Sequence, residues 1–491
     1  MIVNKSDVYK LLDEKQQIFI DTADKIWGDP ELSLSEHNAT KLYEELLFEL
    51  GFEVEHAVAG IETAFAGKFG SGRPVIGILG EYDALAGLSQ KAGELEPCEE
   101  VAGGCGGLAK GYGHGCGHHL LGAGSLAAAW AVKEYLAATG ESGTVIYYGC
   151  PGEEGGAGKA FMAREGLFYA LDAALTWHPG TANEIFTGTN NTSMQVEYTF
   201  NGIAAHAAGN PHMGRSALDA VELMNLGVQF LREHIPNTDC LHYAITNTGG
   251  ISPNVVQSKA TVLYMVRSNN VPNNKKLLQR VDNIAKGAAL MTDTTFTRRF
   301  IDGTADLLPN QVLERALYAN METIPLPEYT KEERDFAAKL DATCPKEEGE
   351  LPGMGAKYDP EIRKKVSELS DGGNATLNDF LCPYFHSGEQ SPGSTDVGDV
   401  SWQTPTAQIM TATWPAHSPG HSWQNVSGGK TGVAHKGMLY AAKVLAATAV
   451  DLITTPELLE KAREEFKVTA AKGYDCPIEP DAVPVPVEEM L

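Results

Sequence analysis

The chain has 491 residues, a length that suits about three domains, and its 43% hydrophobic and 21% charged residues are typical of soluble globular proteins. A formal net charge of −26 argues against a nucleic-acid partner, because such partners are bound through clustered Lys and Arg. No apolar run reaches the roughly 18 residues that cross a membrane, and the N-terminus lacks a signal region. Eight dispersed cysteines predict reduced thiols, so we expect a cytoplasmic protein with no membrane association.

The first part of the sequence alternates apolar strands with helices. Two helices are expected within residues 1–50, and strands over 74–85, 144–150 and 172–180. A long Ala- and Leu-rich helix begins near His119. This alternation predicts an α/β layer with a largely parallel sheet. Polar residues follow each strand, and in such sheets sites form at the carboxyl ends of the strands.

The pattern changes from about residue 190. Residues 193–200 and 259–268 alternate as half-buried strands do, and helices are expected over 216–233 and 274–289. The segment therefore predicts an inserted α+β domain with two helices and a four-stranded sheet, ending near residue 307.

The rest of the chain returns to the α/β layer. Residues 308–395 are predicted to form helices and loops, and a strand over 407–413 with a helix over 432–452 completes the layer. The Pro-containing tail after residue 468 predicts an extended or poorly packed arm. The predicted division is a first part of the α/β domain, an inserted domain, a second part of the α/β domain and a tail, over residues 1–189, 190–307, 308–460 and 461–491.

Three successive strand ends carry side chains of the types that bind transition metals. In GHGCGHHLLG, Cys116 and His118 flank a glycine before the long helix. In PGEEGG, Glu153 and Glu154 directly follow a buried strand, and in TWHPG the strand ends at His178. Thiolate, imidazole and carboxylate are all ligands of divalent metal ions, so together the three motifs predict a metal site.

Each motif alone also has a structural explanation. A lone Cys-His pair can be a core thiol beside a surface histidine, and adjacent glutamates are favoured at a helix N-terminus. A metal site is favoured because all three motifs occur at one edge of the predicted sheet. Two adjacent carboxylates can take different roles, in which one binds a metal ion and the other takes a proton from a metal-activated water. The loop WPAHSPGHSW adds His417 and His421, which gives enough ligands for two ions.

These motifs resemble those of the aminoacylase/carboxypeptidase family of dinuclear metallopeptidases, over roughly residues 10–460. The resemblance is greatest to its amidohydrolase branch, which includes N-acyl-amino-acid, hippurate and indole-acetyl-amino-acid hydrolases. It implies a three-layer α/β catalytic domain with an inserted α+β lid and dimerisation domain. It also implies two divalent ions per subunit, either Zn²⁺ or Mn²⁺.

The resemblance assigns roles to residues of the first two motifs. HGCGHH matches the branch's HACGHD, which implies Cys116 and His118 as ligands. Cys116 is the expected bridge, because a thiolate can bind two ions whereas one imidazole nitrogen cannot. His119 replaces the acidic residue of that motif, whose position supports the site. The family's EEG motif implies Glu153 as general base and Glu154 as ligand.

Further ligands follow from the later motifs. The next strand-end histidine of the family is matched by His178, and its C-terminal HSP motif by His417. We expect His417 rather than His421 as the last ligand, with His421 in a supporting position. Asp83, in EYDAL, stands where the family has an aspartate near the metals, and a turn-forming role is the alternative.

The inserted segment resembles the family's lid. NGIAAHAAGNPHMGRSALDA matches the motif whose histidine, here His206, reaches into the partner subunit's site and stabilises an oxyanion. Asn254 and Arg267 match positions that contact the substrate carboxylate, which the planar guanidinium suits. Packing of His206 and a strand-edge salt bridge of Arg267 are the alternatives. Action across subunits implies a homodimer or a heterodimer with a related subunit.

The resemblance implies hydrolysis of the amide bond of an N-acyl or N-aroyl amino acid, without an acyl-enzyme. The expected substrate is p-aminobenzoyl-glutamate, followed by other N-acyl amino acids or dipeptides. One alternative is a non-catalytic subunit of the same fold, against which the presence of Glu153 and all the ligands argues. Another is a thiol hydrolase with Cys116 as nucleophile, for which no oxyanion motif is evident.

Overall fold

A seven-stranded sheet forms the centre of the main body, in the order β1-β2-β6-β3-β7-β15-β8. The computed structural model describes residues 4–98, 111–347 and 349–490. The four central strands are parallel: β6 (Gly143–Gly149), β3 (Val75–Gly80), β7 (Ala173–Gly180) and β15 (Thr406–Ala412). Antiparallel strands flank them: β1 (Glu53–His56), β2 (Phe65–Ser71) and β8 (Glu184–Phe186).

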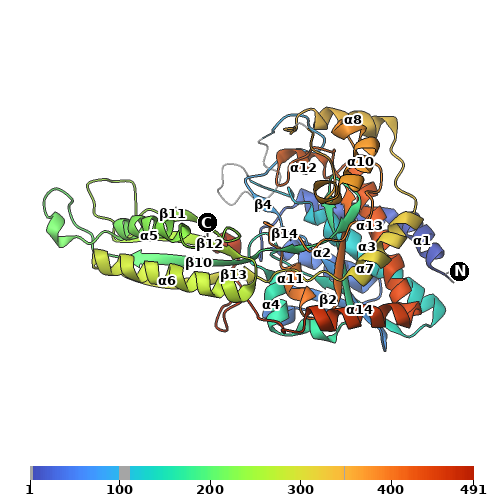
Figure 1. Cartoon of the computed structure of the whole chain (residues 1–491), viewed down its shortest axis with the longest axis horizontal. Helices are drawn as coiled ribbons and strands as arrows, with labels where there is room; N and C mark the ends of the chain where they lie inside the picture. The colour runs from blue at the N-terminus through green and yellow to red at the C-terminus, as the bar shows by residue number, and fades with distance from the viewer. Residues whose placement is uncertain (1–3, 99–110, 348, 491) are drawn as a thin grey trace.

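Helices cover both faces of this sheet (Figure 1). One face carries α1 (Lys5–Gly28), α2 (His37–Glu49), α3 (His118–Thr139), α7 (Gln311–Thr323) and α13 (Gly432–Thr454). The other carries α4 (Gly158–Arg164) and α11 (Val397–Ser401). The central strands are thus buried on both faces, which explains their nearly unbroken apolar sequences. The three-layer α/β architecture predicted from the sequence is confirmed.

The helix α13 lies at the centre of the core. Its length and composition would allow it to cross a membrane, but 83% of its most apolar window is buried inside the protein. It packs against α1, α3 and α7. A helix that is apolar on all sides is what the interior of a large α/β domain requires.

The inserted segment forms a separate antiparallel sheet, which we call the arm (residues 192–304; Figure 1). Its strands lie in the order β11 (Cys240–Asn247), β12 (Lys259–Ser268), β10 (Thr192–Asn201) and β13 (Thr295–Thr304). Alternate residues of β10 and β12 are buried against the helices α5 (Ala217–Arg232) and α6 (Val271–Thr292). In Figure 1 the arm extends away from the body.

The segment between the arm and β15 is mostly helix and loop, as its sequence predicted. After α7 it forms α8 (Lys331–Asp341), α9 (Gly355–Tyr358) and α10 (Pro360–Leu369). In Figure 1, α8 and α10 lie near α12 (Trp423–Gly428) at the top of the body. Short two-residue strands lie in the loops of the body: β4 (Leu85–Ala86), β5 (Tyr112–Gly113), β9 (Thr189–Asn190) and β14 (Gln390–Ser391).

The C-terminal tail is extended, which was one of the two predicted alternatives, and it is packed against the body and the arm. After α14 (Pro456–Thr469) it crosses between the body and the arm. Glu479 pairs through both carboxylate oxygens with Arg298 of β13, at 2.7 and 2.8 Å. The Tyr474 hydroxyl donates to Asp399 of α11 at 2.6 Å. The tail therefore fastens the arm to the catalytic layer.

Substitution of a leucine in α13 tests its place in the core. Leu445 is fully buried, whereas Leu369 of α10 is 50% exposed. Leu445→Ala is expected to lower the free energy of unfolding by about 2–5 kcal/mol, because it leaves a cavity. The matched change Leu369→Ala should cost less than about 0.5 kcal/mol. Urea denaturation followed by circular dichroism measures both, and equal losses would contradict the buried position of α13.

Candidate active site

Side chains from several loops converge at the carboxyl edge of the parallel strands. Glu81 and Asp83 follow β3, Glu153 and Glu154 follow β6, and His178 lies near the end of β7. Because parallel strands end at the same edge, these residues lie together although they are widely separated in the sequence.

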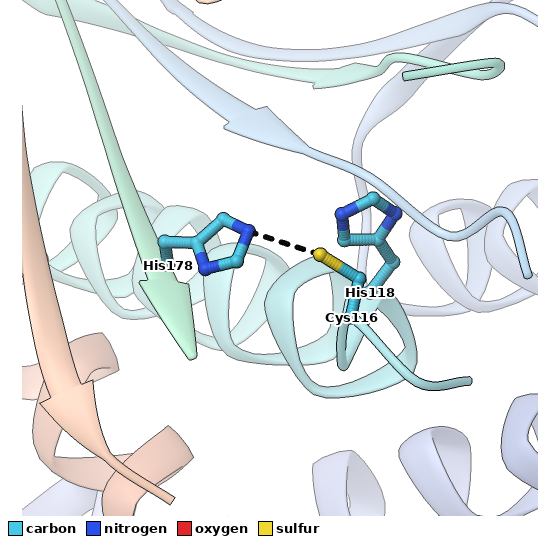
Figure 2. A group of neighbouring side chains, drawn as sticks. All are labelled: Cys116, His118 and His178. Carbon is cyan, nitrogen blue, oxygen red and sulfur yellow. Dashed lines mark hydrogen bonds between the residues drawn. The ribbon is translucent and has the colours of Figure 1, made fainter. Parts of the chain in front are cut away.

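A glycine turn adds two further side chains from the start of α3. Gly117, between Cys116 and His118, has φ +86°, in the left-handed region. A Cβ atom there would also lie 2.7 Å from the ring of Trp414. Glycine therefore permits the turn that directs both neighbours toward β7. Figure 2 shows the result: Cys116 Sγ is 3.4 Å from His178 Nε2, with His118 beside them.

Two groups of three ligand atoms are each compact enough to hold a metal ion. Cys116, His118 and His178 form the first group, and Cys116, Glu154 and His421 form the second. Within each group the atoms lie within 4.8 Å of one another. In the second group, His421 Nε2 is 3.4 Å from Glu154 Oε1. Since Cys116 belongs to both, its sulfur is in place to bridge two ions.

Hydrogen bonds orient the two histidines of the first group as ligands. His118 Nδ1 is 2.8 Å from Asp83 Oδ1, and His178 Nδ1 is 2.7 Å from the carbonyl oxygen of Pro179. Both partners accept, so each Nδ1 carries the proton and each Nε2 presents a lone pair. Burial lowers the pKa of His178 to about 4, which keeps its ring neutral.

Buried atoms at this centre lack partners within the protein. Among the described residues, His118 Nε2, Glu81 Oε2 and Glu154 Oε1 make no hydrogen bond. The first two are 3.2 Å apart but lack hydrogen-bond geometry. Such an atom costs about 1–3 kcal/mol when it stays unpaired. Burial and the Glu154 charge also raise the pKa of the Cys116 thiol well above its usual value. Divalent cations would satisfy these atoms and stabilise the thiolate, so the residues present fit such ions.

Glu153 lies beside the two ligand groups without belonging to either. Its Oε2 is 3.9 Å from His118 Nε2, and with Glu81 and His118 it forms a third cluster of possible ligands. Burial, followed by the charges of Glu81, Asp396 and Glu154, raises the pKa of Glu153 well above its usual value. A carboxyl group in this position can accept a proton and hold it.

A buried lysine offsets the acids behind the site. Lys159 Nζ of α4 donates to Asp396 Oδ1 at 2.5 Å and lies 2.7 Å from Glu81 Oε1, and all three side chains are buried. Neither Glu81 nor Lys159 was selected from the sequence. Glu81 could have been found by the strand-end reasoning that selected Asp83, whereas nothing in GAGKAF distinguishes Lys159 from a surface lysine.

The structure places His417 away from the ligand groups, contrary to its expected role as the last ligand. Its Nδ1 is 2.9 Å from Asp341 Oδ1 and its Nε2 is 3.0 Å from the carbonyl oxygen of Gly373. Both ring nitrogens are therefore engaged by protein acceptors. The physical effect is to tie α8 and the Gly373 turn to the loop that carries His421, and His421 is the histidine of this loop that lies among the ligand atoms.

His119 also points away from the ligand atoms. Its Nε2 is 3.0 Å from the carbonyl oxygen of Gly429, and its ring lies 5.0 Å from that of His114. Burial lowers the pKa of His119 well below its usual value, so the ring is neutral. It holds the turn between α12 and α13 against the start of α3.

The three residues selected in the inserted segment lie on the arm. His206 and Asn254 are exposed, and Arg267 is partly buried in β12. Arg267 Nη1 donates to Ser394 Oγ of the body at 2.5 Å. None of the three has a hydrogen bond or an ion pair with a candidate ligand among the residues that the structure describes. Within one chain, the structure does not bring them to the ligand groups.

The parallel sheet, the two ligand groups and the adjacent free carboxylate define a hydrolase of the metallopeptidase class. The chain belongs to peptidase family M20/M25/M40, whose model matches residues 77–420. The family resemblance inferred from the motifs is thus confirmed.

Individual relatives agree with this membership. The chain is 44% identical to a p-aminobenzoyl-glutamate hydrolase subunit of Escherichia coli K12, over 98% of this chain and 100% of that protein. The solved aminobenzoyl-glutamate utilization protein from Klebsiella pneumoniae shares the fold, with TM-score 0.58 and 15% identity over 91% of this chain and 98% of that one. A Bacillus subtilis dinuclear metal-binding peptidase of the same family has TM-score 0.52 and 17% identity, over 90% and 99%.

Substitution of His417 and substitution of His421 are expected to have different effects on the metal content. Chain loaded with Zn²⁺ and dialysed is expected to retain about two ions, one for each ligand group. His421→Ala should retain about one ion, because it removes a member of the second group, whereas His417→Ala should still retain about two. Inductively coupled plasma mass spectrometry measures the ratio. Loss of an ion from His417→Ala alone would contradict the assignment.

Proposed function

We propose that this metallopeptidase-family hydrolase cleaves the amide bond of p-aminobenzoyl-glutamate, with two divalent ions and Glu153 as general base. The observation that carries the proposal is the pair of ligand groups that share Cys116, with the largely buried carboxylate of Glu153 beside them and in neither group. The E. coli relative, 44% identical over 98% of this chain, is named for hydrolysis of this substrate. Other N-acyl amino acids or dipeptides are the alternative substrates.

The proposed ion sites follow the two ligand groups. Cys116, His118 and His178 would hold one ion, and Cys116, Glu154 and His421 the other. When bound, such ions polarise the amide carbonyl and lower the pKa of the attacking water. Nitrogen and carboxylate ligands accept Zn²⁺ or Mn²⁺, while the thiolate favours Zn²⁺.

Glu153 moves the proton in this mechanism. Its Oε2 takes a proton from the attacking water, and the same carboxyl group then gives it to the nitrogen of the leaving amine. The side chain is largely buried at 14% exposure and lies 3.9 Å from His118 Nε2, so it is next to the ligands and shielded from solvent. Asp83 keeps His118 oriented, and Lys159 balances Glu81 behind it.

His206 is the proposed donor to the oxyanion in a partner subunit's site. The backbone N–H groups of Ala208 and Gly209 donate to its Nδ1 at 3.2 and 3.0 Å. The ring therefore carries its proton on Nε2, which is the form that can donate outward. Since His206 is exposed and apart from its own chain's ligands, we infer that the arm is a lid and dimerisation domain. The partner is a second copy or a related chain, and the E. coli relative is itself named as one subunit of a hydrolase.

Asn254 and Arg267 are the proposed ligands of the substrate carboxylates. Asn254 is an exposed amide on the arm, close to His206 because its carbonyl oxygen accepts from Ala207. Arg267 lies at the junction of arm and body, where its hydrogen bond to Ser394 keeps the guanidinium in place. A guanidinium pairs well with a carboxylate through two parallel hydrogen bonds.

The thiol-hydrolase alternative is disfavoured by the surroundings of Cys116. A nucleophilic cysteine needs a lowered pKa, whereas burial and Glu154 raise the pKa of this thiol. A non-catalytic subunit is disfavoured because Glu153 and both ligand groups are present. The seven described cysteines are free thiols, in keeping with the proposed cytoplasmic location.

Substitution of Glu153 tests the proposed base. Glu153→Gln is expected to lower kcat for p-aminobenzoyl-glutamate by about 10²–10⁴-fold, because the proton acceptor is lost. Glu165→Gln, the same change at an exposed site, should leave kcat unaltered. Release of p-aminobenzoate is measured after removal of metal by a chelator and resupply of Zn²⁺ or Mn²⁺. Wild type that binds ions but leaves the substrate intact would contradict the proposed substrate, and absence of metal binding would contradict the mechanism.

Subunit mixing tests whether His206 acts across a dimer. His206→Ala and Glu153→Gln are each expected to be nearly inactive as pure proteins. After they are unfolded and refolded together, a mixed dimer would combine an intact Glu153 site with an intact His206 from the other chain in one of its two sites. About half of the wild-type rate per mixed dimer should therefore return, which is about a quarter for a random mixture in which half of the dimers are mixed. If the mixture stays as inactive as its components, action across a homodimer is contradicted.

A further inference from the structure

A cavity of about 610 Å³ opens beside the loop that carries His421. Residues 416–420, which directly precede His421, form part of the cavity wall. Glu184 of β8 and residues 345–347, 350–354, 357 and 358 form much of the rest. The volume is that of a small-molecule site, which in proteins spans roughly 300–1,000 Å³. The cavity therefore adjoins the candidate ligands without containing them, and nothing in the mechanism above uses it.

The charged side chains around this cavity are mainly acidic. They are Glu184, Glu347, Glu350 and Glu389, against Lys346 and Lys357. Lys346 is already paired with Asp341, at 2.6 Å. A cavity with this balance repels carboxylates, so it is unsuited to the glutamate end of a p-aminobenzoyl-glutamate molecule.

Glu184, on β8, is the carboxyl group set into the wall of the cavity. Its Oε2 accepts a hydrogen bond from the backbone N–H of Met354 at 2.8 Å. No cation lies within ion-pair distance of it among the residues that the structure describes. Burial raises the pKa of Glu184 to about 7. The second oxygen has no hydrogen-bond partner among those same residues and is available as an acceptor for a ligand.

Apolar side chains accompany this acceptor. Leu351, Met354 and Tyr358 line the same cavity, and the ring of Tyr358 is stacked on Phe385 at 6.1 Å. These apolar side chains, beside the Glu184 carboxylate, suit an aromatic ring that carries a hydrogen-bond donor at its far end.

We propose that this cavity receives the acyl part of the substrate, and that Glu184 selects an aromatic acyl group with a donor at its para position. The inference rests on the proposed function and extends it, because it assigns the two ends of the substrate to different surfaces. The aryl amine faces Glu184 in the body, and the carboxylates face the arm. An acyl group with an anionic end is excluded by the same residue.

Three substrates that differ only at the para position test this assignment. For wild type, kcat/KM should be about tenfold higher for p-aminobenzoyl-glutamate than for benzoyl-glutamate, as expected for one hydrogen bond. p-Carboxybenzoyl-glutamate should be the poorest. In Glu184→Gln the amino preference should fall to about one, and the carboxy compound should improve relative to the other two.

The variant is matched for shape, because the glutamine amide oxygen can still accept from Met354. Glu361→Gln, an exposed position on α10 outside the cavity, serves as the control and should keep the wild-type ratios. Unchanged ratios in Glu184→Gln, or equal preference for the three substrates in wild type, would overturn the cavity assignment and leave the proposed function standing.

If wild type hydrolyses none of the three arylamides, it is the proposed function that fails. The cavity is then tested by binding alone, with calorimetric titration of 4-aminobenzamide and benzamide into metal-loaded wild type and Glu184→Gln. Tighter binding of the amino compound by wild type alone supports the assignment, and equal affinities overturn it.

Discussion

The gathering of carboxylates at one buried sheet edge is the constraint on which the site depends. They are Glu81, Asp83, Glu153, Glu154 and Asp396. Anions buried together repel one another strongly, because the interior screens charge poorly. Lys159 offsets Glu81 and Asp396, and the His118 ring satisfies Asp83. These partners do not offset the negative charge around Cys116. The two ligand groups lie there. This edge of the sheet is therefore suited to binding cations. The balance between the carboxylates and their partners also accounts for where the proton donors and acceptors lie.

Much of this arrangement could be predicted from the sequence, for a reason that lies in sheet geometry. Parallel strands are buried on both faces, so each appears in the sequence as a run of apolar residues. A polar residue that interrupts such a run marks the end of the strand. Glu153 and His178 were each found at such an interruption, and parallel strands bring their carboxyl ends to one edge. Cys116 was found instead in a glycine-flanked turn before the long helix. The pattern also predicted the arm's half-buried strands, because alternation has a period of two residues.

The remainder depends on contacts between distant parts of the chain. His417 and His421 lie four positions apart in one loop, and the match of His417 to the HSP motif favoured the histidine that lies away from the ligand groups. What separates them is Asp341 and Gly373, which engage both nitrogens of His417 from other elements. Lys159 reads as a surface lysine until Asp396 folds against it. Much of the cavity wall comes from residues 345–347, 350–354, 357 and 358. Most of these lie in loops without hydrophobic periodicity, so the sequence does not predict the path of the chain there.

The crossing of the tail from body to arm has a mechanical consequence. A domain joined only through the strands at its base could swing as a hinge, with an amplitude set by those connections alone. Here the C-terminal tail is a third connection between the body and the arm. Its Tyr474 is hydrogen-bonded to the body, and its Glu479 is paired with the arm. Any rotation that moves the arm away from the body must therefore extend the tail or break the ion pair between Glu479 and Arg298. That pair is partly exposed, so its contribution to holding the arm weakens as the ionic strength rises.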